Sequence, residues 1–274
     1  MDRPGQRPAR RLPLGLLVLV GAAALAIRLL WPGPPGAPPE RPGRTFEAAV
    51  VRVIDGDTAV VRTGGREETV RYIGIDAPEL ERDRREGPGW AAREANRQMI
   101  DGARVRLELD AEARDQYGRL LAYVYAGDVF VNERLVREGM AVAFVAPPND
   151  RRAQSILEGQ RAAVVEGRGL WGQAAARIVA ADRAGSYIGL PATVEGVVHR
   201  AHFDPESGIA FLNFGPDPRR DFVVIIRRPF RPLFPEPPEL RYAGRRVRVK
   251  GLVERFQRQP QISVQVPEQI EVMD

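Results

Sequence analysis

The stretch from Val53 to Glu79 constrains the fold more than any other part of the sequence. Its two β-rich halves are joined by Gly64-Gly65, a combination that predicts a hairpin. In that hairpin Asp57 begins one strand, directly after an Asp-Gly turn, and Asp76 ends the partner strand. Both carboxylates are therefore expected at the same end of a β-sheet.

The same stretch contains two further charged residues that are expected near these carboxylates. Arg71 lies in the second strand, and Glu79 follows Ala-Pro, where the proline ends the strand. Oxygen ligands that converge in this way suit Ca²⁺ or Mg²⁺ rather than zinc. From Asp55 we expect only that its side chain organises the Asp-Gly turn.

The composition excludes several kinds of site. The chain has 274 residues, enough for two domains, and its 44% hydrophobic and 28% charged residues are typical of a globular protein. It has no cysteine, which excludes disulfides, thiolate nucleophiles and zinc–thiolate sites. The net charge is +5, but residues 1–44 contain seven arginines and two acidic residues and so hold the whole surplus. The overall charge is therefore no evidence for nucleic-acid binding.

The first 31 residues have the pattern of a membrane signal. Four arginines precede an apolar run at 12–27, and Trp31 follows where a membrane interface is expected. We expect residues 1–31 to be a transmembrane signal anchor that leaves the rest of the chain on the extracytoplasmic side. The alternative is a secretory signal cleaved after Ala-Leu-Ala, which would release the protein. Residues 32–44 are rich in proline and are predicted to be an extended linker.

Residues 45–172 are predicted to form the first folded domain. Besides the hairpin, strands are expected at 46–54, 104–109 and 120–125, and helices at 88–100, 132–139 and 151–166. Five strands in a small barrel with three helices indicate an α+β fold of the OB type.

The same residues resemble the staphylococcal nuclease (thermonuclease) family. The resemblance rests on Ile-Asp-Gly-Asp-Thr at 54–58, Ile-Asp-Ala-Pro-Glu at 75–79, Asp-Gln-Tyr-Gly-Arg at 115–119 and Val-Asn-Glu-Arg-Leu-Val-Arg-Glu-Gly at 131–139. The order and spacing of these segments agree across about residues 45–172. The resemblance implies the barrel and helices of that family, and an endonuclease that hydrolyses phosphodiester bonds in DNA and RNA.

The resemblance also implies a role for particular residues. Calcium would be bound by two carboxylates and one backbone carbonyl, those of Asp57, Asp76 and Ala77. The catalytic side chains would be Arg71, Arg119 and Glu79. Two planar guanidinium groups can brace the negative charge that builds on a phosphate under attack. The glutamate would orient or deprotonate the attacking water.

The nucleotide pocket departs from the family pattern. Gln116 stands where the family has a lysine, and Phe144 and Ala146 stand where it has two tyrosines that hold a bound nucleotide. Phe144 keeps a ring that can stack on a base but offers no hydroxyl group. We predict nucleic-acid contacts at Tyr117 and Phe144.

The remainder is predicted as a linker at 173–185 and a second, OB-like β-barrel at 186–274. Its five strands are expected at 192–198, 209–214, 222–226, 245–253 and 260–266. Most of its seven phenylalanines are expected to fill the barrel. A few at the rim would form a nucleic-acid surface with nearby arginines, namely Arg227, Arg228, Arg245, Arg246 and Arg248. His199 and His202 have no evident third ligand, so no zinc site is predicted.

The function predicted from these patterns is Ca²⁺-dependent hydrolysis of DNA or RNA, single- or double-stranded, by an exported and membrane-tethered nuclease. One alternative is a scaffold of nuclease-like and OB domains that binds nucleic acid or protein with little catalysis. Such a scaffold is expected to lack some of the arginines or carboxylates, and this chain lacks none. A second alternative is that the C-terminal domain binds protein or peptidoglycan-associated partners. The sequence itself indicates no protein partner.

Overall fold

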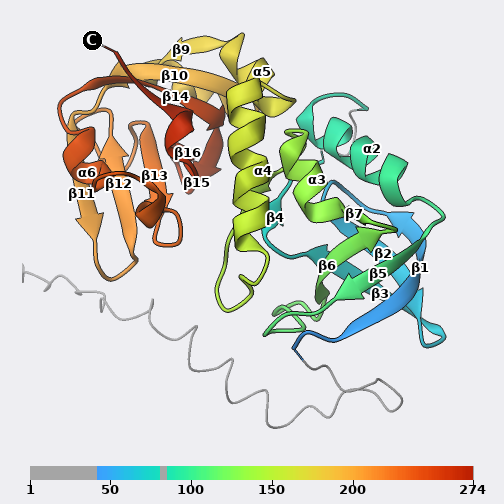
Figure 1. Ribbon diagram of the computed structural model, residues 1–274. Helices are drawn as coiled ribbons and strands as arrows, with labels where there is room; N and C mark the ends of the chain where they lie inside the picture. The colour runs from blue at the N-terminus through green and yellow to red at the C-terminus, as the bar shows by residue number, and fades with distance from the viewer. Residues whose placement is uncertain (1–41, 81–84, 274) are drawn as a thin grey trace, which may run out of the picture. The chain divides into compact units, whose positions relative to one another are not determined.

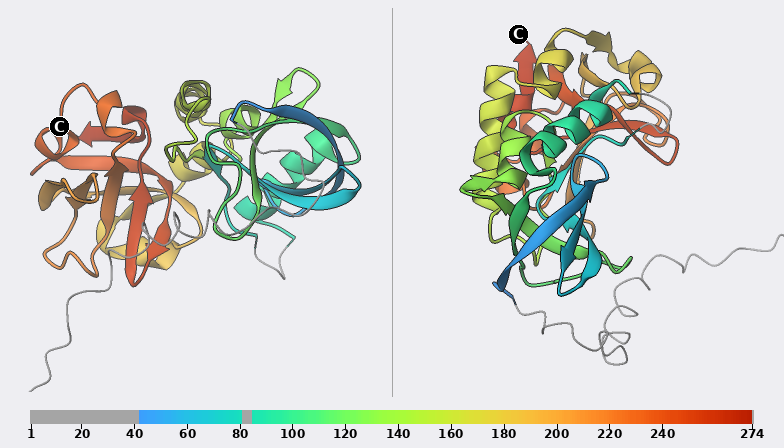
Figure 2. Two further views of the ribbon diagram at one scale, coloured as in Figure 1. Left: turned by 90° about the horizontal axis from the view of Figure 1, so that it is seen from below. Right: turned by 90° about the vertical axis from the view of Figure 1, so that its right-hand side faces the viewer.

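Five strands near the start of the chain close into a barrel. The computed structural model describes residues 42–80 and 85–273. Neighbouring strands of this barrel are antiparallel, except that the strand at 66–72 pairs in parallel with the strand at 120–126 and so closes the ring (Figure 1). The ring is seen from a second direction in Figure 2. Its strands are, in chain order, β1 (Thr45–Val53), β2 (Thr58–Thr63), β3 (Arg66–Tyr72), β5 (Arg104–Glu108) and β6 (Leu120–Ala126). The predicted OB-type α+β fold is confirmed.

Three helices cover this barrel at the predicted positions. They are α2 (Pro88–Ile100), α3 (Val131–Arg137) and α4 (Ala153–Glu166). α2 contacts β1, and α3 contacts β6 and α4. Three very short strands, β4 (Ile75–Asp76), β7 (Val129–Phe130) and β8 (Val142–Ala143), complete the domain, and β4 pairs with β8. The fully buried side chains between barrel and helices include Ile75, Leu107 and Leu135.

The described residues of the C-terminal part, up to 273, form nine strands in two sheets. One sheet has the order β17-β14-β10-β9 and the other β11-β12-β13-β16-β15. Five of the nine correspond to the predicted strands: β10 (Pro191–Val197), β12 (Ile209–Asn213), β13 (Val223–Arg227), β14 (Arg246–Leu252) and β16 (Gln259–Ser263). The sequence patterns did not predict the other four, β9 (Ile178–Ala180), β11 (Arg200–Asp204), β15 (Glu254–Phe256) and β17 (Ile270–Met273). That this domain is an OB barrel stays a prediction.

Short helical segments connect these strands. α5 (Leu170–Ala175) precedes β9, the 3₁₀ helix η1 (Ala181–Tyr187) follows it, and η2 (Arg231–Leu233) and α6 (Pro238–Arg241) lie between β13 and β14. The 3₁₀ helix η3 (Pro267–Gln269) leads into β17. Because β9 pairs in parallel with β10, the stretch predicted as a linker, 173–185, contributes a strand to the C-terminal sheet. The domain boundaries themselves stay a prediction.

Helix α4 is shared between the two parts, which belong to one compact unit. Ala163 and Val164 of α4 and Trp171 of α5 form a buried cluster with Val266 of the C-terminal part. Leu157, also on α4, packs against both of the larger hydrophobic cores. The C-terminal part is thus joined to the barrel domain by buried apolar contacts, which is the interaction that contributes most to stable docking.

The predicted membrane segment, residues 1–31, lies outside the described residues. Within 42–80 and 85–273, no helix is both long enough and apolar enough to cross a bilayer.

Candidate active site

The turn between β1 and β2 places Asp57 at one end of the barrel. The backbone N–H of Asp57 donates to Asp55 Oδ1 at 3.0 Å, so Asp55 organises the turn as predicted. Gly56 is required here by close packing: a Cβ at this position would lie 2.5 Å from the Cβ of Ala77. The turn is therefore pressed against the residue that follows β4, and the two motifs of the hairpin stretch meet.

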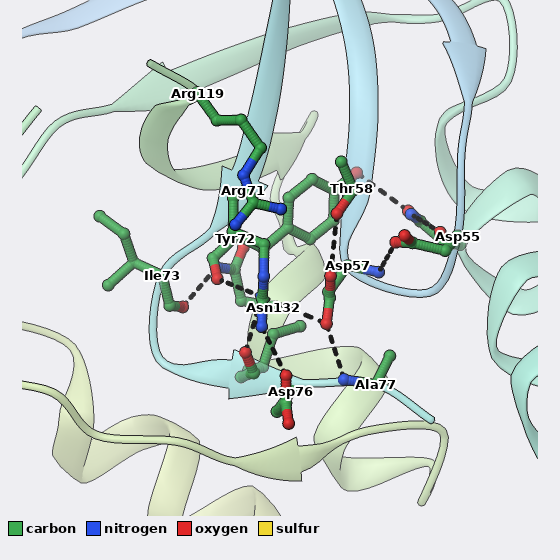
Figure 3. A network of polar contacts seen from close by, with 12 residues as sticks. Asp55, Asp57, Thr58, Arg71, Tyr72, Ile73, Asp76, Ala77, Arg119 and Asn132 are labelled. Carbon is green, nitrogen blue, oxygen red and sulfur yellow. Dashed lines mark hydrogen bonds and ion pairs between the residues drawn. The ribbon is translucent and has the colours of Figure 1, made fainter. Parts of the chain in front are cut away.

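Arg71 joins the two predicted metal-binding carboxylates. Its Nη2 lies 2.6 Å from Asp76 Oδ1, and its Nη1 lies 3.2 Å from Asp57 Oδ2 (Figure 3). Nη1 also donates to the carbonyl oxygens of Tyr72 and Ile75, at 3.0 and 2.8 Å. One guanidinium thus fixes the end of β3 and the start of β4 and brings both carboxylates to one point. The predicted convergence of Asp57 and Asp76 is what the structure has.

The two carboxylates differ in exposure, because the Asp57 side chain is buried while that of Asp76 is still 46% exposed. Asp57 is only 5% exposed, and this burial raises its pKa to about 7, although Arg71 beside it acts in the opposite direction. Burial also raises the pKa of Asp76, again against the effect of Arg71. The charge of one arginine therefore does not fully compensate the two carboxylates. Additional positive charge at this point would stabilise their ionised forms.

The oxygen atoms at this point fit a hard divalent cation. Asp57 Oδ2 accepts a hydrogen bond of 2.7 Å from the backbone N–H of Ala77, which orients that carboxylate toward β4. No cluster of three or more His, Cys, Asp or Glu side chains capable of holding a metal occurs within 42–80 and 85–273. Two carboxylates would thus need backbone carbonyls and waters to complete a coordination shell, and Ca²⁺ accepts such mixed oxygen shells. The carbonyl of Ala77 stays the predicted third protein ligand.

Arg119 reaches the same face of the barrel from the start of β6. In the parallel pair β3–β6, Leu121 lies opposite Arg71, and Arg119 precedes Leu121 by two residues, so the two arginines share a face. Figure 3 shows the Arg119 side chain extending toward the Arg71 network. Asp115 Oδ2 accepts from Arg119 Nε at 2.7 Å. In the described part of the chain, the two terminal NH₂ groups of Arg119 have no hydrogen-bond partner and remain available to a ligand.

The loop that carries Arg119 is held by one carboxylate. Asp115 Oδ1 accepts the backbone N–H groups of Tyr117 and Arg119, both at 2.9 Å. The Tyr117 ring is 75% exposed and lies beneath the Arg119 guanidinium, 5.6 Å from its Cζ to the ring centroid. An exposed ring beside an arginine is suited to stacking on a base, which supports the prediction for Tyr117.

Glu79 lies at the wall of a cavity of about 640 Å³. Asp76, Ala77 and Trp90 line the same cavity. The Glu79 side chain is exposed and makes no hydrogen bond or ion pair with another described residue. Its backbone is held closely, because a Cβ on Gly89 in the first turn of α2 would lie 2.1 Å from the Glu79 carbonyl oxygen. Glu79 therefore combines a fixed backbone with a side chain that is open to the cavity.

Two buried asparagines position the site and were not predicted. Asn96 on α2 donates to the carbonyl of Asp55 at 2.9 Å and accepts from the Tyr72 hydroxyl at 3.1 Å. Asn132 on α3 accepts from the N–H of Val124 and donates to the carbonyl of Ile73, at 2.9 and 2.8 Å. The signal in the sequence was an asparagine on the otherwise apolar face of a helix, where its amide needs buried partners.

The other predicted nucleic-acid contacts lie in different surroundings. Phe144 follows β8 and is 39% exposed. Glu195 accepts from both Arg246 and Arg248, at 3.2 and 3.0 Å, so the charge of these two arginines is partly compensated. Neither they nor Arg245 is among the residues that line the cavity beside Asp76. The nucleic-acid role of these three arginines stays a prediction.

Comparison with known proteins agrees with this geometry. The family model for staphylococcal nuclease homologues matches residues 69–173. The thermonuclease of Staphylococcus intermedius is 41% identical over 124 residues, which cover 44% of this chain and 74% of that protein. The thermonuclease of Staphylococcus hyicus is 36% identical over 124 residues, 44% of this chain and 73% of that protein. Endonuclease YncB of Bacillus subtilis (strain 168) is 41% identical over 104 residues, which cover 36% and 49% of the two chains. The chain therefore belongs to the staphylococcal nuclease family and is a nuclease.

Proposed function

We propose that this nuclease hydrolyses phosphodiester bonds of DNA and RNA in a Ca²⁺-dependent reaction at the face that carries Arg71 and Arg119. The observation that supports this most is the bridge from Arg71 to Asp57 and Asp76, at 3.2 and 2.6 Å. It joins the buried carboxylate of Asp57 to the carboxylate of Asp76, which lines a cavity large enough for part of a nucleic-acid strand.

In this proposal Asp57, Asp76 and the carbonyl of Ala77 hold the calcium ion. When bound, the ion supplies positive charge that offsets the charge of the phosphate. The two carboxylates are then fully ionised, since the ion provides the compensation that Arg71 alone does not. Their fixed hydrogen bonds, including that from the Ala77 N–H to Asp57, orient them before the ion binds.

The chain's own charged side chains would act on the phosphate. Arg119 has two unengaged NH₂ groups, which suit two parallel hydrogen bonds to phosphate oxygens. Arg71 would shift part of its bonding from the carboxylates to the phosphate once the ion is in place. Glu79, open to the cavity, would orient or deprotonate the attacking water. Cleavage at the 5′-oxygen, leaving a 3′-phosphate, is the outcome that the family resemblance implies.

We also propose that the enzyme works outside the cytoplasm, tethered by residues 1–31. The support is four arginines ahead of a single apolar run and a proline-rich spacer after it. In spheroplasts, added protease is expected to digest the nuclease while cytoplasmic markers stay intact. Protection of the nuclease would reverse the proposed topology. Release into the medium with a shortened N-terminus would instead favour a cleaved signal.

The catalytic proposal is tested by digestion of single-stranded DNA, double-stranded DNA and RNA with the purified protein. Each substrate is incubated with Ca²⁺, with Mg²⁺ and with excess chelator. Cleavage that requires Ca²⁺ and gives 3′-phosphate ends is the expected result. Full activity in excess chelator would contradict the role of the metal. Binding without cleavage under all three conditions would favour the scaffold alternative.

A further inference from the structure

Arg227, at the end of β13 in the C-terminal domain, extends toward the nuclease site. Its Cζ lies 5.8 Å from the ring centroid of Phe144. Phe144 directly follows β8, and its backbone N–H donates to the Gly74 carbonyl at 2.8 Å, one residue before β4. β4 ends at Asp76. Arg227, which lies outside the residues 69–173 that match the family model, is therefore placed beside the strand that carries Asp76.

The Arg227 guanidinium lacks a carboxylate partner. Its Nη1 donates to Ser263 Oγ on β16 at 2.6 Å, which fixes its direction. No ion pair and no other side-chain hydrogen bond of this arginine occurs with any residue the structure describes. Neighbouring arginines of the same domain differ: Arg231 pairs with Glu239 at 2.5 Å, and Arg248 pairs with Glu195 at 3.0 Å. Arg227 is thus a half-buried cation with most of its five N–H donors unused.

Arg227 is not among the residues that line the cavity beside the predicted metal ligands, but its charge acts on two carboxylates that do line it. Asp76 and Glu254 both line this cavity. Burial raises the pKa of each of these carboxylates, and Arg227 acts against that rise in both cases. Arg227 therefore lies within electrostatic reach of two walls of the cavity, one from each domain. Neither carboxylate is close enough to form an ion pair with it.

We infer that Arg227 binds a phosphate group of the nucleic-acid strand that occupies the cleavage site. An arginine held in one direction, with free donors and without a neutralising carboxylate, matches a phosphate in charge and in geometry. Its position above the Phe144 ring would set that phosphate next to a base stacked on the ring. The C-terminal domain would thus supply a cation beside Phe144, which the nuclease domain, within its described residues, does not itself place there.

This inference rests on the proposed function. Two measurements distinguish a failure of the inference from a failure of the proposed function. The first is binding of a fluorescein-labelled 12-residue oligothymidylate, followed by anisotropy in chelator, where no cleavage occurs. The second is cleavage of the same oligonucleotide in Ca²⁺. Arg227→Ala is compared with Arg220→Ala, a control of equal charge change in the same domain whose side chain is 79% exposed.

Arg227→Ala is expected to weaken oligonucleotide binding by roughly 10- to 100-fold, as for the loss of a charged hydrogen bond. The slope of the logarithm of the binding constant against the logarithm of the salt concentration should become shallower by about 0.7, the value for the loss of one phosphate contact on a single strand. KM should rise with little change in kcat, and Arg220→Ala should match the wild type. Thermal unfolding of the variant near the wild-type Tm establishes that the domains remain docked.

A role in domain docking alone would give a lower Tm with an unchanged salt slope, and that result would overturn the inference. Wild-type binding and KM retained by the folded Arg227→Ala protein would overturn it as well. Absence of cleavage by the wild type would count against the proposed function instead. In that case the anisotropy measurement still decides whether Arg227 binds phosphate.

Discussion

The side-chain amide of Gln160 on α4 donates a hydrogen bond of 3.0 Å to Gln265 Oε1 in the C-terminal domain, and both residues are buried. Gln160 Oε1 in turn accepts the backbone N–H of Ala143 on β8, also at 3.0 Å. On the other side, the N–H of Gln265 donates to Gln269 Oε1 at 2.8 Å. A buried polar chain thus connects the C-terminal domain to the strand that pairs with Asp76.

We predict that Gln160→Ala lowers the free energy of unfolding by about 2–4 kcal/mol, because it leaves two buried polar groups unpaired and opens a small cavity. Urea unfolding measures the change. Gln154→Ala on the same helix is the control, since Gln154 is exposed and bonds only to Glu158. Its effect should stay within about 0.5 kcal/mol. Equal effects of the two substitutions would show that the buried chain contributes nothing to docking.

Asp57→Asn should abolish the response of stability to added Ca²⁺ and remove the part of its pH dependence that comes from Asp57. The pKa of Asp57 is raised in the folded protein from 3.8 to about 7. A raised pKa means that the folded state binds more protons than the unfolded state over this range, so the stability of the metal-free protein falls as the pH rises from about 4 to 7. An asparagine at position 57 cannot deprotonate, so the variant does not lose stability in this pH range through this residue.

Thermal unfolding in chelator therefore should give a higher Tm for Asp57→Asn than for the wild type at pH 8, with the difference vanishing near pH 4. Added Ca²⁺ should raise the Tm of the wild type and leave the variant unchanged. An equal gain in Tm for both proteins would place the calcium site elsewhere.

Arg119→Lys is expected to lower kcat by on the order of 10²–10³ with a smaller change in KM. Lysine keeps the charge but loses the planar pair of NH₂ groups that suits two phosphate oxygens. Arg62→Lys serves as the control, because Arg62 lies in the same barrel and pairs only with Glu67 at the surface. An effect of Arg119→Lys confined to KM would show that this arginine binds the ground state and not the transition state.

The sequence was sufficient for the barrel and for the convergence of its charged residues. The alternation of apolar residues is a local pattern, and so are the Asp-Gly and Gly-Gly turns. These patterns therefore located β2 and β3 within a few residues. The predicted position of Asp76 at the end of the partner strand was wrong in detail: β3 ends at Tyr72, and Asp76 lies in the separate strand β4, where Arg71 joins it to Asp57. Asn96 and Asn132 were missed, because their partners, Asp55 and Ile73, are 41 and 59 residues away in the chain.

The C-terminal domain was harder to predict for a related reason. β9 and β15 have only three residues each, too short for a period to be recognised, and β9 became a strand only by pairing with β10. The sequence grouped Arg227 with four other arginines in one surface. In the structure the hydrogen bond to Ser263 Oγ holds Arg227 beside Phe144, a contact between residues far apart in the chain that no local pattern predicts.

The close approach of Gly89 to Glu79 gives a test of how far the reaction depends on the position of the Glu79 backbone. Alanine at position 89 would place its Cβ 2.1 Å from the Glu79 carbonyl oxygen and 3.0 Å from Leu80 Cα, so the backbone before α2 must move. We expect Gly89→Ala to lower kcat by about tenfold or more and to leave Ca²⁺ affinity unchanged, because the proposed ligands Asp57 and Asp76 lie on other elements. Gly185→Ala is the matched control, because the nearest atom to its Cβ, Pro260 Cγ, lies 3.9 Å away. Unchanged kcat in a folded Gly89→Ala protein would show that Glu79 tolerates displacement and argue against its role in catalysis.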